Sequence, residues 1–147
     1  MKTLLEWDDV HSDKPNHEGQ TPLSGAAFSG HAEVVKMLLE RDDVNPNKSD
    51  DRGATSLHYA ASNGSTGVVQ MLLERGDIHH DKPNNQGVTP LHCATVSGHA
   101  EVVKMLLERG DVHPDQQGVH GRRVLQLWTQ LLWLVVPLSL AYIMSPL

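Results

Sequence analysis

The chain has 147 residues, a formal net charge of −6 and one cysteine, which allows a single ordinary domain and excludes an internal disulfide. A lone cysteine agrees with a reducing compartment, so we expect a cytoplasmic protein. All 18 acidic residues lie in residues 1–121, and an acidic body argues against a nucleic-acid binder, which needs a basic surface.

A motif recurs along the chain every 34 residues. The segment SGHAEVVKMLLER stands at residues 29–41 and again at 97–109, and a diverged copy, NGSTGVVQMLLER, stands at 63–75. Equivalent glycines open complete units at 19–52, 53–86 and 87–120, and residues 1–18 align with the second half of a unit. A repeat of this length indicates a stack in which each unit buries its apolar side against its neighbours.

Each unit predicts two helices followed by an exposed loop. In the first unit, Thr21 and Pro22 are typical of a helix start, and Gly30 is typical of the left-handed residue at a helix end. The second helix carries an apolar stripe that is expected to face the core, formed by Val34, Val35, Leu38 and Leu39. The segment after it is rich in Asp, Asn, Pro and Gly and predicts a turn.

The third unit contains TPLHCATVSGHAEVVKMLLERGD at residues 89–111, which resembles an ankyrin repeat. The resemblance covers residues 2–121, and the units look most like the long ankyrin arrays of fungal proteins. A tetratricopeptide repeat has a similar period, but its Trp-Leu-Gly-Tyr pattern is absent from the sequence. The resemblance implies an all-α solenoid of stacked helix-turn-helix units with finger loops, which binds another protein and needs no cofactor.

Ten histidines raise the possibility of a metal site, but no zinc-binding spacing accompanies them. The resemblance implies that His58 and His92 form hydrogen bonds within and between units. His79 and His80 are interpreted as solvated loop residues. Cys93 lacks a positioned base and is interpreted as a half-buried filler of the first helix. We therefore expect neither a metal site nor enzymatic activity.

The resemblance also implies where a partner protein would bind, because the family varies the residues around each unit's first glycine and before its hinge glycine. Phe28 is the one aromatic residue among them and is the predicted hot spot. The acidic composition favours a partner that offers Lys or Arg. The predicted binding residues are His17, Glu18, Gln20, Phe28, Ser29, Asp51, Arg52, Ala54, Ser62, Asn63, Asn85, Gln86, Val88, Val96 and Ser97.

The repeat pattern is lost in residues 121–147. Trp128 falls where the complete units have a small residue, so a fourth unit is not expected. From Val124 to Met144 the chain has 21 uncharged residues, which as a helix would span about 31 Å, enough for a bilayer core. Arg122 and Arg123 would keep the repeats on the cytosolic side. Three interpretations remain open: a lid helix packed on the last unit, a membrane anchor in a tail-anchored adaptor, and an accident of gene structure.

Overall fold

The computed structural model of the chain describes residues 12–109, and this part contains six helices and no strand. The architecture is all-α, as predicted. Each 34-residue unit contributes one pair of helices, and the bounds are α1 (Pro22–Ser29), α2 (Ala32–Leu39), α3 (Ser56–Asn63), α4 (Thr66–Glu74), α5 (Pro90–Val96) and α6 (Ala100–Glu108).

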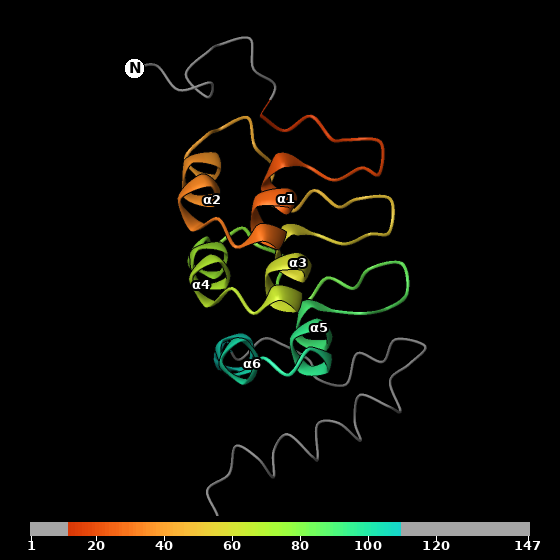
Figure 1. Ribbon diagram of the computed structural model, residues 1–147, viewed down its shortest axis with the longest axis vertical. Helices are drawn as coiled ribbons and strands as arrows, with labels where there is room; N and C mark the ends of the chain where they lie inside the picture. Colours follow the sequence, from red (N-terminus) through yellow and green to blue (C-terminus); the bar gives the residue numbers. More distant parts are fainter. Residues whose placement is uncertain (1–11, 110–147) are drawn as a thin grey trace, which may run out of the picture.

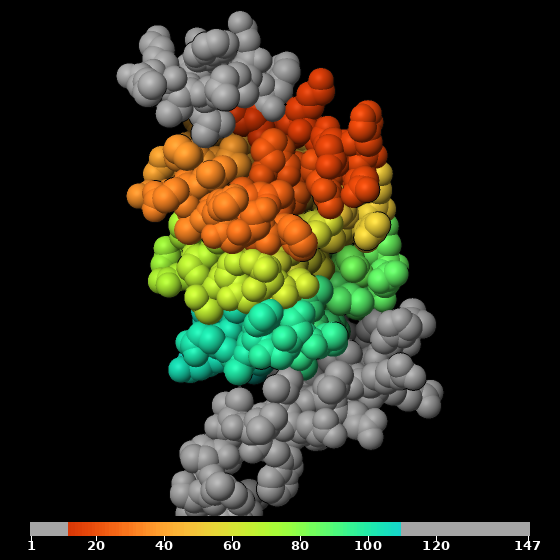
Figure 2. Space-filling view, viewed as in Figure 1, coloured from red at the N-terminus to blue at the C-terminus, as the bar shows by residue number. Residues whose placement is uncertain are grey.

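The helix pairs stack in chain order as three layers (Figures 1 and 2). The first helices of the units form one row, in which α3 packs between α1 and α5, and the second helices form a parallel row of α2, α4 and α6. The loops before the first helices project from the side of the α1–α3–α5 row. We call residues 12–20, 42–54 and 76–88 the fingers.

The threonines predicted to begin the first helices cap them. The Thr21 Oγ1 atom accepts a hydrogen bond from the Ser24 amide at 3.2 Å, and the Thr89 Oγ1 atom accepts one from the His92 amide at 3.3 Å. These bonds satisfy amide groups that have no partner inside the helix. At the other end of the helix, Gly30 has φ +70°, the left-handed conformation that the sequence predicts there.

Small residues form the interface between the first helices. Ala27, Ala60, Ala61 and Ala94 are completely buried, and the leucine at the start of each of these helices is buried with them. Because alanine adds only a methyl group, it lets adjacent helix backbones approach closely. This close packing supports the interpretation that a tryptophan at the equivalent position of a further unit would not fit.

The apolar stripe of the second helix is buried only in part. In α2, Val35 and Leu38 are buried and Leu39 is half-buried, but Val34 is 38% exposed. The prediction for Val34 is therefore wrong. Its equivalents Val68 and Val102 are 1% and 0% exposed because each has a preceding unit in the described part of the chain.

Polar side chains connect each unit to the next. The Arg75 guanidinium donates a hydrogen bond to the Leu39 carbonyl at the end of α2, at 2.7 Å, and Arg109 repeats this bond with Leu73. The side-chain amide of Asn47 donates through its nitrogen to the Asp77 backbone carbonyl at 2.6 Å. Its oxygen accepts from the His79 backbone amide at 2.8 Å. These contacts hold adjacent fingers and helices in register.

His58 connects two units from a buried position. Its Nδ1 atom lies 3.1 Å from the Thr55 backbone amide, and its Nε2 atom lies 2.9 Å from the Val88 carbonyl. Because an amide can only donate and a carbonyl can only accept, the ring is neutral with its proton on Nε2. Burial lowers the pKa of His58 below its ordinary value, in agreement with this assignment.

The lowered pKa of His58 predicts a loss of stability in mild acid. Between pH 6.5 and pH 5 the unfolded chain takes up a proton that the folded ring resists, so the free energy of unfolding should fall as the pH falls through this range. His58→Gln, which cannot titrate, should lose less stability over this interval than the wild type. Urea unfolding at pH 7.5 and pH 5.0 measures the difference, with His17→Gln in the exposed first finger as the control. An unchanged pH dependence in His58→Gln contradicts the assignment.

Candidate protein-binding surface

The residues predicted to bind a partner lie on one side of the molecule, in the finger turns and on the α1–α3–α5 row. We call this surface the inner face. Because the units stack with a 34-residue period, equivalent residues form columns, such as Phe28, Ser62 and Val96 at the ends of the first helices. None of the fifteen is buried: Gln20, Ala54 and Val88 are half-buried and the other twelve are exposed.

Two apolar side chains dominate the inner face. Phe28 is 59% exposed and Val96 is 63% exposed, the highest values among the large hydrophobic residues of the described part. They stand in the same column, two layers apart, with the small polar Ser62 between them. An apolar side chain held this far out of the core by a regular helix is available to a partner.

Tyr59 belongs to the same surface and is missing from the prediction. Its ring packs edge-to-face with Phe28, with the ring centroids 5.9 Å apart and the planes at 89°. The sequence contained a signal for it, since Tyr59 precedes Ser62 by three residues in one helix and so shares its face. We call Phe28 and Tyr59 the aromatic corner.

A hydrogen-bond network holds Tyr59 in place. The Tyr59 hydroxyl donates to the Asp50 carboxylate and accepts from the Gln20 side-chain amide at 3.1 Å. Burial, followed by the bond to Asp50, raises the pKa of Tyr59 above its ordinary value, so the phenol keeps its proton and remains the donor. The Tyr59 side of the aromatic corner is therefore held in place by the protein itself.

The finger turns are fixed in the same way. The Asp50 Oδ1 atom accepts hydrogen bonds from the Arg52 and Ala54 amides, both at 2.9 Å. Asn16 and Asn84 occupy the equivalent positions and accept the equivalent pairs of bonds in their own turns. Such side-chain-to-backbone bonds set the direction of the residues between them, which are the predicted binding residues of each finger.

A family model for ankyrin repeats, in three copies, matches residues 1–82 and 43–117. This chain belongs to the ankyrin-repeat family. A search of curated proteins found no match. The identification agrees with the predicted family and with the stacked helix pairs, and ankyrin repeats are generally protein–protein interaction modules.

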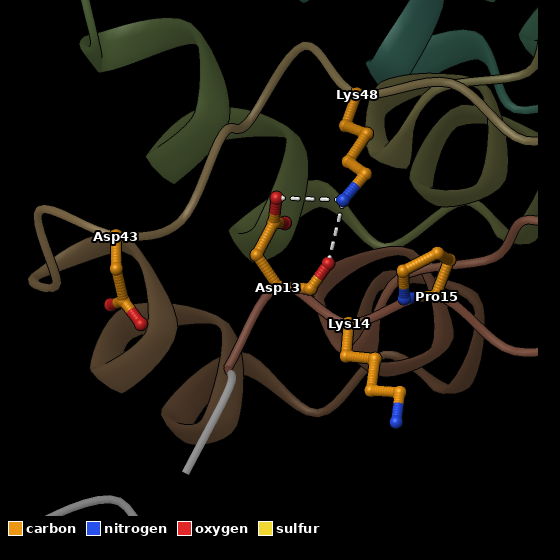
Figure 3. Close-up of a pocket in the computed structure, with 5 residues that line it drawn as sticks. All are labelled: Asp13, Lys14, Pro15, Asp43 and Lys48. Carbon is orange, nitrogen blue, oxygen red and sulfur yellow. Dashed lines mark hydrogen bonds and ion pairs between the residues drawn. The ribbon is translucent and has the colours of Figure 1, made fainter. Parts of the chain in front are cut away.

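The ankyrin fingers also enclose a shallow pocket, lined by Asp13, Lys14, Pro15, Asp43 and Lys48 (Figure 3). The Lys48 ammonium lies 3.0 Å from an oxygen of the Asp13 carboxylate and donates to the Asp13 backbone carbonyl at 2.7 Å. Asp43 in turn accepts from the Arg41 guanidinium at 2.8 Å. The Lys48–Asp13 pair connects the first two fingers.

The described ankyrin units contain little that resembles a reactive centre. Within residues 12–109, no group of three His, Cys, Asp or Glu side chains is arranged to hold a metal ion. Cys93 is half-buried against the core, as predicted, and burial raises the pKa of its thiol to about 11. A thiol with this pKa is protonated at neutral pH and is a poor nucleophile.

The predicted membrane segment cannot be compared with the structure, since Val124 to Met144 lie outside the described residues. Among the helices within residues 12–109, none is long and apolar enough to cross a bilayer. The predicted division of the chain into units at 1–18, 19–52, 53–86 and 87–120, with a tail at 121–147, likewise stays a prediction.

Proposed function

We propose that this ankyrin-repeat protein binds a partner protein through its inner face, with the aromatic corner at the centre of the contact. The observation that carries the proposal is the pairing of Phe28 and Tyr59. Phe28 is 59% exposed, yet it packs against a tyrosine that Asp50 and Gln20 hold in place. A few residues contribute most of the binding energy of a protein interface, and large aromatic side chains are common among them.

The rest of the inner face supports the same function. The fingers and first helices present polar side chains around the aromatic corner, in positions set by backbone hydrogen bonds within each turn. An apolar centre with a polar rim is the usual composition of a protein interface. Because the helices beneath are packed with alanine, the surface keeps its shape and a partner loses little free energy in ordering it.

Site-specific photo-crosslinking tests the surface directly. A photoreactive amino acid in place of Ser62, which lies between Phe28 and Val96, should capture a partner when the full chain is irradiated in cells. The same amino acid in place of Gln70, exposed on α4 in the other row, should capture it far less. Equal capture at both positions, or capture at Gln70 alone, contradicts the assignment of the inner face.

The sequence also supports a membrane-tethered form of the same module. The 21 uncharged residues from Val124 to Met144 follow two arginines, which is the pattern of a tail anchor with the repeats in the cytosol. Flotation of cell lysates on a density gradient tests this form. The full chain should float with membranes and resist carbonate, whereas residues 1–121 should remain in the dense fractions. If the full chain stays in the dense fractions as well, the module is not tethered.

A further inference from the structure

The charge of the finger turns, residues 16–18, 50–52 and 84–86, is uneven along the stack. At the first two layers, the finger turns carry three carboxylates and one guanidinium, those of Glu18, Asp50, Asp51 and Arg52. At the third layer, the equivalent positions are the neutral Asn84, Asn85 and Gln86. The negative end of the face is therefore also the end that holds the aromatic corner.

The carboxylates lie close together because the finger turns are hydrogen-bonded to each other. The Asp51 amide donates to the Glu18 carbonyl at 3.1 Å, which places these two turns side by side. Glu18 and Asp51 are exposed, while Asp50 lies behind them and binds the Tyr59 hydroxyl. An incoming cation at this end would meet carboxylates on the fingers and aromatic rings on the helices.

We infer that the inner face recognises an extended basic segment of its partner, with an Arg or Lys at the first two layers and an aliphatic residue at Val96. The inference rests on the proposed function and names the partner's chemistry. A guanidinium stacks on aromatic rings and pairs with carboxylates at the same time, which neither an acidic nor a purely apolar side chain can do. Val96 lies in the layer whose finger turn, residues 84–86, carries no charge, and it offers only an apolar contact.

The layer spacing sets the distance between the two recognised residues. Packed helices lie about 8–10 Å apart, so the two layers between Phe28 and Val96 correspond to roughly 16–20 Å. An extended chain advances about 3.3 Å per residue and spans this distance in about five or six residues, and six, as an even number, leaves both side chains on one side of the strand. The expected motif is therefore a basic residue and an aliphatic residue about six positions apart.

A random library of displayed peptides tests the inference before the partner is identified. Peptides of about twelve residues are selected on the full chain, and their affinities are measured by fluorescence anisotropy. We expect enrichment of Arg or Lys with an aliphatic residue about six positions away, and affinities that fall when salt is raised from about 50 to about 500 mM. The charge-reversed double variant, Glu18→Lys with Asp51→Lys, should weaken the selected peptides at least tenfold.

A second double variant separates the effect of charge at the proposed site from the effect of the protein's net charge. Glu40→Lys with Glu74→Lys changes the net charge equally, at exposed positions of the second-helix row, and should change affinity less than twofold. If the two double variants have equal effects, or if the selected peptides are not basic, this inference is overturned. The inner face remains the binding surface in that case, provided that Phe28→Ala weakens the binding of the selected peptides. If Phe28→Ala changes none of the affinities, the proposed function fails as well. If no peptide is enriched, the face does not recognise a linear segment and the inference is wrong.

Discussion

Leu72→Ala is expected to lower the free energy of unfolding by about 3 kcal/mol, because it removes a fully buried side chain from the middle of the core. Leu72 lies in α4, which packs against both α2 and α6, so neighbouring layers on both sides lose contacts. Typical domains are stable by only about 5–15 kcal/mol, and the loss should be visible as a large shift in the midpoint of urea unfolding followed by circular dichroism.

Met37→Ala provides the control for this prediction. Met37 lies in α2 of the same helix row and has a side chain of similar size, but it is 38% exposed. Its truncation should cost about 1 kcal/mol or less, since much of its surface is already in contact with water. If both variants unfold at the same urea concentration, the buried stripe is not what holds the layers together.

Gly64→Ala should lower the free energy of unfolding by about 3 kcal/mol, because two costs add. Gly64 has φ +72°, a conformation that a Cβ atom disfavours. A Cβ atom at this position would also clash with the imidazole of His99, in the next unit, whose Cε1 atom would lie only 2.6 Å away. That ring is held by a bond from its Nε2 atom to the Ser62 carbonyl at 3.0 Å, so it cannot move aside freely.

Gly98 offers the matched comparison for Gly64. It has φ +77°, but no described heavy atom lies within 4 Å of the place its Cβ would occupy. Gly98→Ala should therefore cost only the backbone term, about 1 kcal/mol. Adding His99→Ala to Gly64→Ala should recover part of the loss, and thermal unfolding of the single and double variants gives the coupling energy. A coupling energy of zero shows that the clash with His99 does not determine the cost.

Much of the fold could be predicted from local chemistry. Thr21 and Thr89 begin helices and Gly30 ends one because hydroxyl capping and a positive φ depend on neighbouring residues. The 34-residue period then predicts that the units stack, because a unit with one apolar side has to bury that side against another unit. A stack of helix pairs follows from these two facts, whereas the family was indicated by the resemblance of residues 89–111 to an ankyrin repeat.

The burial of individual residues was less predictable, because identical segments lie at different places in the stack. Val34 and Val102 occupy the same position in the same thirteen-residue segment, yet they are 38% and 0% exposed. Leu39 is half-buried, whereas its counterpart Leu107 is 38% exposed. The neighbouring layer decides these values, and a single unit's sequence contains no information about its neighbours.

The binding role of the fifteen predicted residues stays a prediction, and the structure shows only where they lie and how accessible they are. All fifteen predicted residues lie on the inner face or its finger turns with at least part of their side chains accessible. Tyr59 is not among the predicted residues, because the sequence shows only a variable position of the first helix there, with Gly25 and Cys93 in the other units. The structure shows its contacts between units, with Phe28 and Gln20 of the unit before it, which the sequence of one unit does not contain.

The affinity of the crosslinked partner for two truncation variants tests the central claim most directly. Isothermal titration calorimetry should show that Phe28→Ala weakens binding by about 30-fold, the effect of losing a hot spot of about 2 kcal/mol. Met37→Ala, which truncates an exposed side chain of the other helix row, should weaken binding less than twofold. If Phe28→Ala binds as tightly as Met37→Ala, the aromatic corner is not the centre of recognition and the partner docks elsewhere on the stack.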